Sequence, residues 1–101
     1  MRLLITGIAG FAGSHLAEFA LSQGVDVWGA VRPGASTEHI EHVRGRLRLV
    51  ECELLDERSV EALVAAARPD LVAHLAAQSS AAAYQALGEA WPATSRTRVT
   101  R

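Results

Sequence analysis

The stretch Ile5-Thr6-Gly7-Ile8-Ala9-Gly10-Phe11-Ala12-Gly13-Ser14-His15-Leu16 decides the fold of this chain. The apolar run Leu3-Leu4-Ile5 leads into it and an apolar-periodic segment follows, so we expect a strand, a tight turn and a helix. Gly7 would allow the turn, Gly10 would let a pyrophosphate approach the backbone, and Gly13 would let the helix pack against the strand. The free N–H groups of the new helix would then face the phosphates, which predicts a dinucleotide site.

The composition narrows the class of protein. The 101 residues suffice for one globular domain, since half of them are hydrophobic. Residues 1–90 carry seven arginines against eleven acidic residues, and this acidic body argues against a nucleic-acid partner. All ten basic residues other than histidine are arginine, so no mechanism that needs a lysine amine is available to this sequence.

Cysteine content and hydropathy indicate where in the cell the protein is expected to be. Cys52 is the single cysteine, which excludes an internal disulfide and a zinc site built on clustered cysteines, and we expect it to pack as a small apolar residue at a strand end. The apolar run at the N-terminus is too short for a signal peptide, and no apolar stretch approaches the ~20 residues of a membrane span. A cytoplasmic location without a membrane partner is the default expectation.

The order of the predicted elements gives the architecture. We expect strands at 2–6, 25–31, 46–51 and 70–75, helices at 11–23 and from the N-cap Asp56 to Pro69, and a short helix at 38–44. This alternation predicts an α/β fold, a partial Rossmann fold with three α/β/α layers and a doubly wound parallel sheet in the order 3-2-1-4. Residues 1–80 would form this half-domain. Residues 81–101 would be a divergent helical or irregular tail, with helix favoured at 79–87.

The end of the second strand bears on the type of cofactor. Sites for NAD usually place an acidic residue there to bind the ribose 2′-hydroxyl, whereas this chain has Val31 and Arg32. A guanidinium can bind a 2′-phosphate, with Ser36 and Thr37 as additional hydroxyl donors, so the sequence favours NADP over NAD. The alternative is that Arg32 is an ordinary exposed loop charge.

Residues after the third and fourth strands complete the candidate site. Glu53 and the backbone of Leu54 would border an adenine pocket, and the small residues Ala76 and Ala77 after Leu75 would leave room for a ribose. The sequence also contains four histidines. His74 is favoured as a structural histidine over an acid or base, His15 as a helix-surface residue, and His39 with His42 as surface residues rather than metal ligands.

Five motifs together resemble the N-terminal part of an extended short-chain dehydrogenase/reductase. They are the glycine stretch at 6–16, then Gly-Ala-Val-Arg at 29–32, Glu-Leu-Leu-Asp at 53–56, Arg-Pro-Asp at 68–70 and His-Leu-Ala-Ala-Gln-Ser-Ser at 74–80. The chain most resembles the NAD-dependent epimerase/dehydratase group, and within it the GDP-mannose 4,6-dehydratases and GDP-4-keto-6-deoxy-mannose reductases. The resemblance implies cofactor contacts from the three glycines, Phe11, Arg32, Leu54 and residues 75–77.

The departures from that family limit the expected activity. The resemblance implies a catalytic Tyr-x-x-x-Lys pair, but Tyr84 is followed four residues later by Gly88 and the chain has no lysine. We therefore expect the cofactor-binding portion of a nucleotide-sugar dehydratase, epimerase or reductase, inactive alone and encoded by a truncated or frame-shifted gene or a fragment of one. The alternatives are a non-catalytic dinucleotide-binding module and a non-functional product. An unpaired edge of the fourth strand would favour homo-oligomers.

Overall fold

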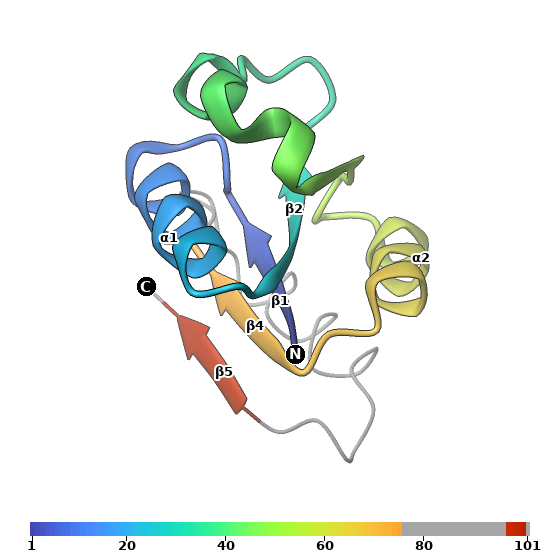
Figure 1. Cartoon of the computed structure of the whole chain (residues 1–101). Helices are drawn as coiled ribbons and strands as arrows, with labels where there is room; N and C mark the ends of the chain where they lie inside the picture. The colour runs from blue at the N-terminus through green and yellow to red at the C-terminus, as the bar shows by residue number, and fades with distance from the viewer. Residues whose placement is uncertain (76–96, 101) are drawn as a thin grey trace.

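The computed structural model describes residues 1–75 and 97–100, which form a parallel sheet covered by helices (Figure 1). Its strands are β1 (Arg2–Thr6), β2 (Asp26–Val31), β3 (Arg48–Glu51), β4 (Leu71–His74) and β5 (Thr97–Thr100). They lie in the order β3-β2-β1-β4-β5, and every neighbouring pair is parallel. The Rossmann-type α/β fold and the strand order 3-2-1-4 expected from the sequence are therefore confirmed.

Helices cover the two faces of the sheet. The α-helices are α1 (Phe11–Ser22) and α2 (Glu57–Ala67), and a 3₁₀ helix, η1 (Glu38–Arg46), connects β2 to β3. Figure 1 shows α1 and α2 on opposite sides of the sheet. Side chains alternate along β1 accordingly: Leu4 packs in the α2 layer, while Leu3 and Ile5 pack in the layer of α1 and η1. Within residues 1–75, no helix has both the length and the hydropathy that crossing a membrane requires.

The ends of the helices follow the local signals in the sequence. The Asp56 carboxylate accepts a hydrogen bond of 3.0 Å from the Arg58 backbone N–H, as expected of an N-cap. Helix α2 ends at Ala67, where Arg68 adopts a left-handed conformation with φ 47° before Pro69. After α1, Gly24 has φ 76° and allows the chain to turn into β2.

The strand β5 was not expected from the sequence. Residues 81–101 were predicted to form a tail, but Thr97–Thr100 pair with β4 in parallel, with Leu71 opposite Thr97 and His74 opposite Thr100. The second edge of β4 offers N–H and C=O groups that need partners, and threonine and valine suit a strand. The β4 edge that was expected to be free is therefore occupied by β5, and self-association of the chain stays a prediction. The helix expected at 79–87 lies outside the described residues.

Candidate functional site

The turn between β1 and α1 is shaped by glycine. Gly7 has φ 73°, a left-handed conformation that reverses the strand, and the Gly10 N–H donates to the Gly7 carbonyl at 3.1 Å. Gly10 is the N-cap of α1, and the helix has neither a side-chain cap nor an acidic residue in its first turn. The N–H groups of the first turn have no acceptor within a helix. This end of α1 therefore offers backbone donors and a positive dipole end to an anion.

Gly13 and Gly10 fill different roles in that turn. A Cβ on Gly13 would lie 2.2 Å from the Gly7 carbonyl oxygen and 2.7 Å from the Ile8 Cα, so the helix can approach the strand only without a side chain there. A Cβ on Gly10 would make only an ordinary contact of 3.4 Å with the Gly7 oxygen. Packing within the chain thus requires glycine at position 13. At position 10 the chain itself leaves room for a Cβ, so packing does not require glycine there.

A cavity of about 390 Å³ opens beside this turn. It is lined by residues from four places: the glycine turn (Gly7, Ala9, Gly10, Phe11, Ala12 and Gly13), the end of β2 and its loop (Ala30, Val31, Arg32 and Ala35), the end of β3 (Cys52, Glu53, Leu54 and Leu55), and Leu75 after β4. These are the carboxyl ends of four neighbouring parallel strands. Ligands of open α/β sheets bind at this edge.

Most of the residues singled out in the sequence lie together in this cavity. Ten of them line it: Gly7, Ala9, Gly10, Phe11, Ala12, Gly13, Arg32, Glu53, Leu54 and Leu75. Ser36 is not among the lining residues; its hydroxyl accepts a 3.5 Å hydrogen bond from the Glu38 N–H at the start of η1. Ala76 and Ala77 lie outside the described residues. The assignment of these residues to a cofactor stays a prediction.

The cavity also contains residues that were not assigned to it from the sequence. These are Ala30, Val31, Ala35, Cys52 and Leu55. Each lies within a few residues of the carboxyl end of a predicted strand. That position is the sequence signal from which these lining residues could have been predicted. Glu53 folds back on its own loop, where its carboxylate accepts a 3.2 Å hydrogen bond from the Leu55 N–H. Arg32 and Glu53 are the two charged residues of a lining that is otherwise apolar or glycine, a composition typical of small-molecule sites.

Cys52 is buried beside the cavity in a setting that suppresses its reactivity. Burial raises the pKa of its thiol to about 11, and the nearby carboxylates of Glu53 and Asp56 act in the same direction. The thiolate is the reactive form of cysteine, so this residue is a weak nucleophile at neutral pH. Its side chain packs in the α2 layer of the core, in agreement with the apolar role expected from the sequence.

We expect the native chain to react with iodoacetamide at pH 8 about a hundredfold more slowly than the same chain unfolded in urea. The reason is the raised pKa of the Cys52 thiol, together with its burial. Mass spectrometry of timed samples measures both rates, and the unfolded chain is the control. Equal rates in the two states would show that Cys52 is exposed and ionised in the fold.

His74 has a structural role next to the cavity. It is buried, and its Nδ1 shares a hydrogen bond of 2.5 Å with the Thr6 hydroxyl across the β1–β4 pair. Burial lowers the pKa of its imidazole, which favours the neutral ring at physiological pH. The bond joins the two strands just before Leu75, whose N–H donates to the Thr6 carbonyl at 3.1 Å. His74 therefore fixes the strand ends at the switch point between β1 and β4.

His15 and His42 lie on the outer surface between α1 and η1, and His39 is exposed on η1. The Glu18 carboxylate contacts His42 Nε2 at 2.5 Å and His15 Nδ1 at 3.4 Å. The hydrogen bond to His42, followed by the charges of both histidines, lowers the pKa of Glu18. In the part of the chain that the structure describes, no three histidine, cysteine or acidic side chains are arranged to hold a metal ion. The Glu18–His42 contact joins η1 to α1.

The sequence matches a known family model and curated relatives. The model of GDP-mannose 4,6 dehydratase matches residues 4–86. CDP-paratose 2-epimerase from Salmonella typhi is 38% identical over 82 residues, which cover 77% of this chain and 24% of the relative. GDP-mannose 4,6 dehydratase from Homo sapiens is 36% identical over 86 residues, 75% of this chain and 23% of the relative. The chain thus spans about a quarter of the length of these relatives.

A solved structure supports the same grouping. UDP-glucose 4-epimerase from Thermus thermophilus, determined as a complex with NAD, superposes with a TM-score of 0.77 at 30% identity. The match covers 89% of this chain and 33% of that structure. Together with the glycine turn and the strand order, the family match over residues 4–86 shows that this chain belongs to the GDP-mannose 4,6 dehydratase family of extended short-chain dehydrogenases/reductases.

Proposed function

We propose that this chain binds NADP(H) in the cavity at the carboxyl edge of its sheet, as the dinucleotide-binding portion of a nucleotide-sugar dehydratase, epimerase or reductase. The observation that carries the proposal is the cavity itself, which runs from the uncapped N-terminus of α1 to Arg32 at the end of β2. Its volume of about 390 Å³ lies within the range of small-molecule sites. The family and the NAD complex of the Thermus thermophilus relative support the class of ligand.

The pyrophosphate would lie on the glycine turn. The open N–H groups of the first turn of α1 would donate to its oxygens, and Gly10 would let the diphosphate approach the backbone. Phe11 is largely exposed at the rim and packs edge-on against His15, with ring centroids 4.3 Å apart. This contact would hold the aromatic ring to one side of the bound phosphates.

The adenosine half would lie toward β2 and β3. Leu54 and Leu55 give this end an apolar wall, and the second oxygen of the Glu53 carboxylate, which does not bond Leu55, would accept from the adenine amino group. Leu75, with Ala76 and Ala77 after it, would border the ribose on the nicotinamide side. When bound, the nicotinamide would supply or accept a hydride. The sequence lacks a Tyr-x-x-x-Lys pair, so we propose that these 101 residues bind the cofactor without turning over a sugar.

Arg32 is the residue that favours NADP. It is exposed at the mouth of the cavity, and within the described residues its guanidinium makes no ion pair. No carboxylate stands at the end of β2 to repel a 2′-phosphate, since Val31 fills that position. A guanidinium bound to a phosphate is a charge-assisted interaction, stronger than a neutral hydrogen bond.

Replacement of Arg32 with glutamine should raise the Kd for NADP about tenfold, because one charge-assisted contact is lost. The Kd for NAD should change less than about twofold, since NAD has no 2′-phosphate. Titration calorimetry with both dinucleotides measures the two values. Arg46→Gln, which removes an exposed guanidinium on η1, is the matched control. Tighter binding of NAD than of NADP by the unmodified chain would end the preference for NADP.

A further inference from the structure

The loop that carries Arg32 is a defined turn. The Ala35 N–H donates to the Arg32 carbonyl at 3.0 Å, and Gly34 between them has φ 80°. Arg32 and Ala35 both line the cavity, so the turn forms part of its wall. One such hydrogen bond in an exposed loop cannot by itself hold the four residues of the turn in place. Other contacts must therefore hold the turn at the cavity.

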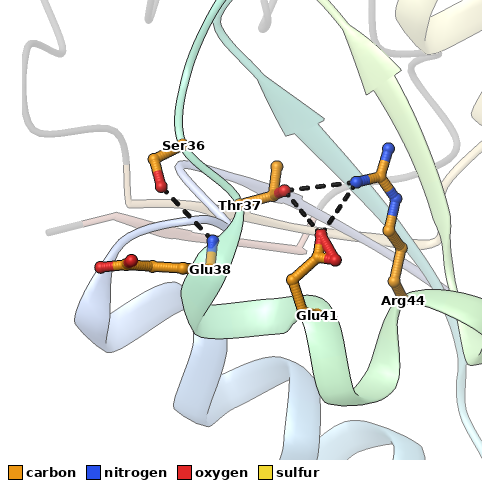
Figure 2. A network of polar contacts seen from close by, with 5 residues as sticks. All are labelled: Ser36, Thr37, Glu38, Glu41 and Arg44. Carbon is orange, nitrogen blue, oxygen red and sulfur yellow. Dashed lines mark hydrogen bonds and ion pairs between the residues drawn. The ribbon is translucent and has the colours of Figure 1, made fainter.

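Three side chains from η1 and its N-cap form a polar cluster after the turn, shown in Figure 2. The Thr37 hydroxyl donates to Glu41 Oε1 at 2.9 Å, and Arg44 Nη1 donates to both, at 3.2 Å to Thr37 Oγ1 and 3.0 Å to Glu41 Oε1. We call Thr37, Glu41 and Arg44 the Thr37 cluster. The hydrogen bond from Thr37, and after it that from Arg44, lowers the pKa of the Glu41 carboxyl, which favours the ionised carboxylate at neutral pH. Figure 2 shows the Glu38 carboxylate pointing away from these side chains.

The helix to which the cluster attaches is itself anchored. A 3₁₀ helix of nine residues has poor hydrogen-bond geometry and gains little from its backbone. Ile40 and Val43 are buried against the layer of α1, and the His42–Glu18 contact joins η1 to α1 from the outer side. The core therefore fixes η1, and the Thr37 cluster ties the end of the Arg32 turn to this fixed base.

We propose that the Thr37 cluster is a positioning device that holds the Arg32 turn against the cavity and so sets the preference for a 2′-phosphorylated dinucleotide. This inference rests on the proposed function. The three side chains do not line the cavity and act only through Arg32. With the turn already ordered, Arg32 can bind a phosphate without a further loss of backbone entropy; without the cluster, that loss weakens binding.

The substitution Thr37→Val removes the hydroxyl and keeps the shape of the side chain. We expect it to raise the Kd for NADP about fivefold, the equivalent of one hydrogen bond, and to leave the Kd for NAD within about twofold. Thr37→Ser keeps the hydroxyl and should retain the affinity of the unmodified chain. In the Arg32→Gln background, Thr37→Val should have no further effect, because its action passes through Arg32. Calorimetry measures both Kd values for Thr37→Val, Thr37→Ser, Arg32→Gln and the double variant. A thermal unfolding curve for each variant checks that it is folded.

A second measurement needs no cofactor. Hydrogen exchange followed by NMR should show the Ala35 amide exchanging about fivefold faster in Thr37→Val than in Thr37→Ser, since the turn opens more often. An equal rise of both Kd values in Thr37→Val, or an unchanged Ala35 exchange rate, would overturn the positioning role. If the unmodified chain bound neither dinucleotide, the proposed function and the discrimination it implies would be wrong. The exchange rates would still decide whether the cluster holds the turn.

Discussion

The substitution Gly13→Ala is expected to lower the free energy of unfolding by about 3 kcal/mol, the upper part of the range for overpacking a core. The added Cβ would lie 2.2 Å from the Gly7 carbonyl oxygen and 2.7 Å from the Ile8 Cα, and both are backbone atoms that cannot rotate aside. Helix α1 would have to move away from β1, which would open the layer that contains Ile8 and Ala17. Urea unfolding followed by circular dichroism measures the change.

Gly45→Ala is the matched control for this substitution. Gly45 lies on η1, and a Cβ there would meet no atom within 4 Å. Its effect on stability should stay within about 1 kcal/mol and could be favourable, because alanine restricts the unfolded chain. A Gly13→Ala variant with the unfolding midpoint of the unmodified chain would mean that α1 does not contact β1 as closely as described. The role assigned to the third glycine would then be wrong.

Local signals in the sequence predicted the parts of the fold that depend on local chemistry. The Asp56 cap, the left-handed Gly24 and the turn at Gly7 each follow from the conformational preferences of one residue type. Continuous apolar runs predicted buried parallel strands, and the alternation of strands and helices predicted their order. In a parallel sheet the carboxyl ends of the strands meet at one edge, so the predicted fold by itself brought most of the predicted site residues together.

The parts that the sequence did not predict depend on distant contacts. The strand β5 forms by pairing with β4. The local pattern of residues 97–100 does not indicate which strand they pair with. The short helix expected at 38–44 is present as η1 (Glu38–Arg46), with Ile40 and Val43 buried in the layer of α1, but its 3₁₀ geometry was not predicted. The role of Ser36 at a 2′-phosphate stays a prediction; its hydroxyl oxygen accepts a hydrogen bond from the Glu38 N–H at the start of η1.

Gly10→Ala is expected to leave the fold unchanged and to weaken dinucleotide binding about thirtyfold. Gly10 has φ −77° and ψ 174°, an extended conformation that alanine adopts readily, and its Cβ would make only an ordinary 3.4 Å contact. In the proposed complex the methyl group would enter the space of the pyrophosphate, at a cost of about 2 kcal/mol for a forced contact. Calorimetry and an unfolding curve on the same sample separate binding from folding.

The pattern across the two dinucleotides distinguishes this effect from that of Arg32. NAD and NADP share the pyrophosphate, so Gly10→Ala should weaken both by the same factor, whereas Arg32→Gln should weaken NADP alone. Ala12→Gly, which removes a methyl group from the same cavity wall, is a control for altered packing and should not reduce affinity for either ligand by steric conflict. If Gly10→Ala bound both dinucleotides as tightly as the unmodified chain, the diphosphate could not lie on the glycine turn. The cavity would then have to bind its ligand in another orientation, with α1 contributing no donors.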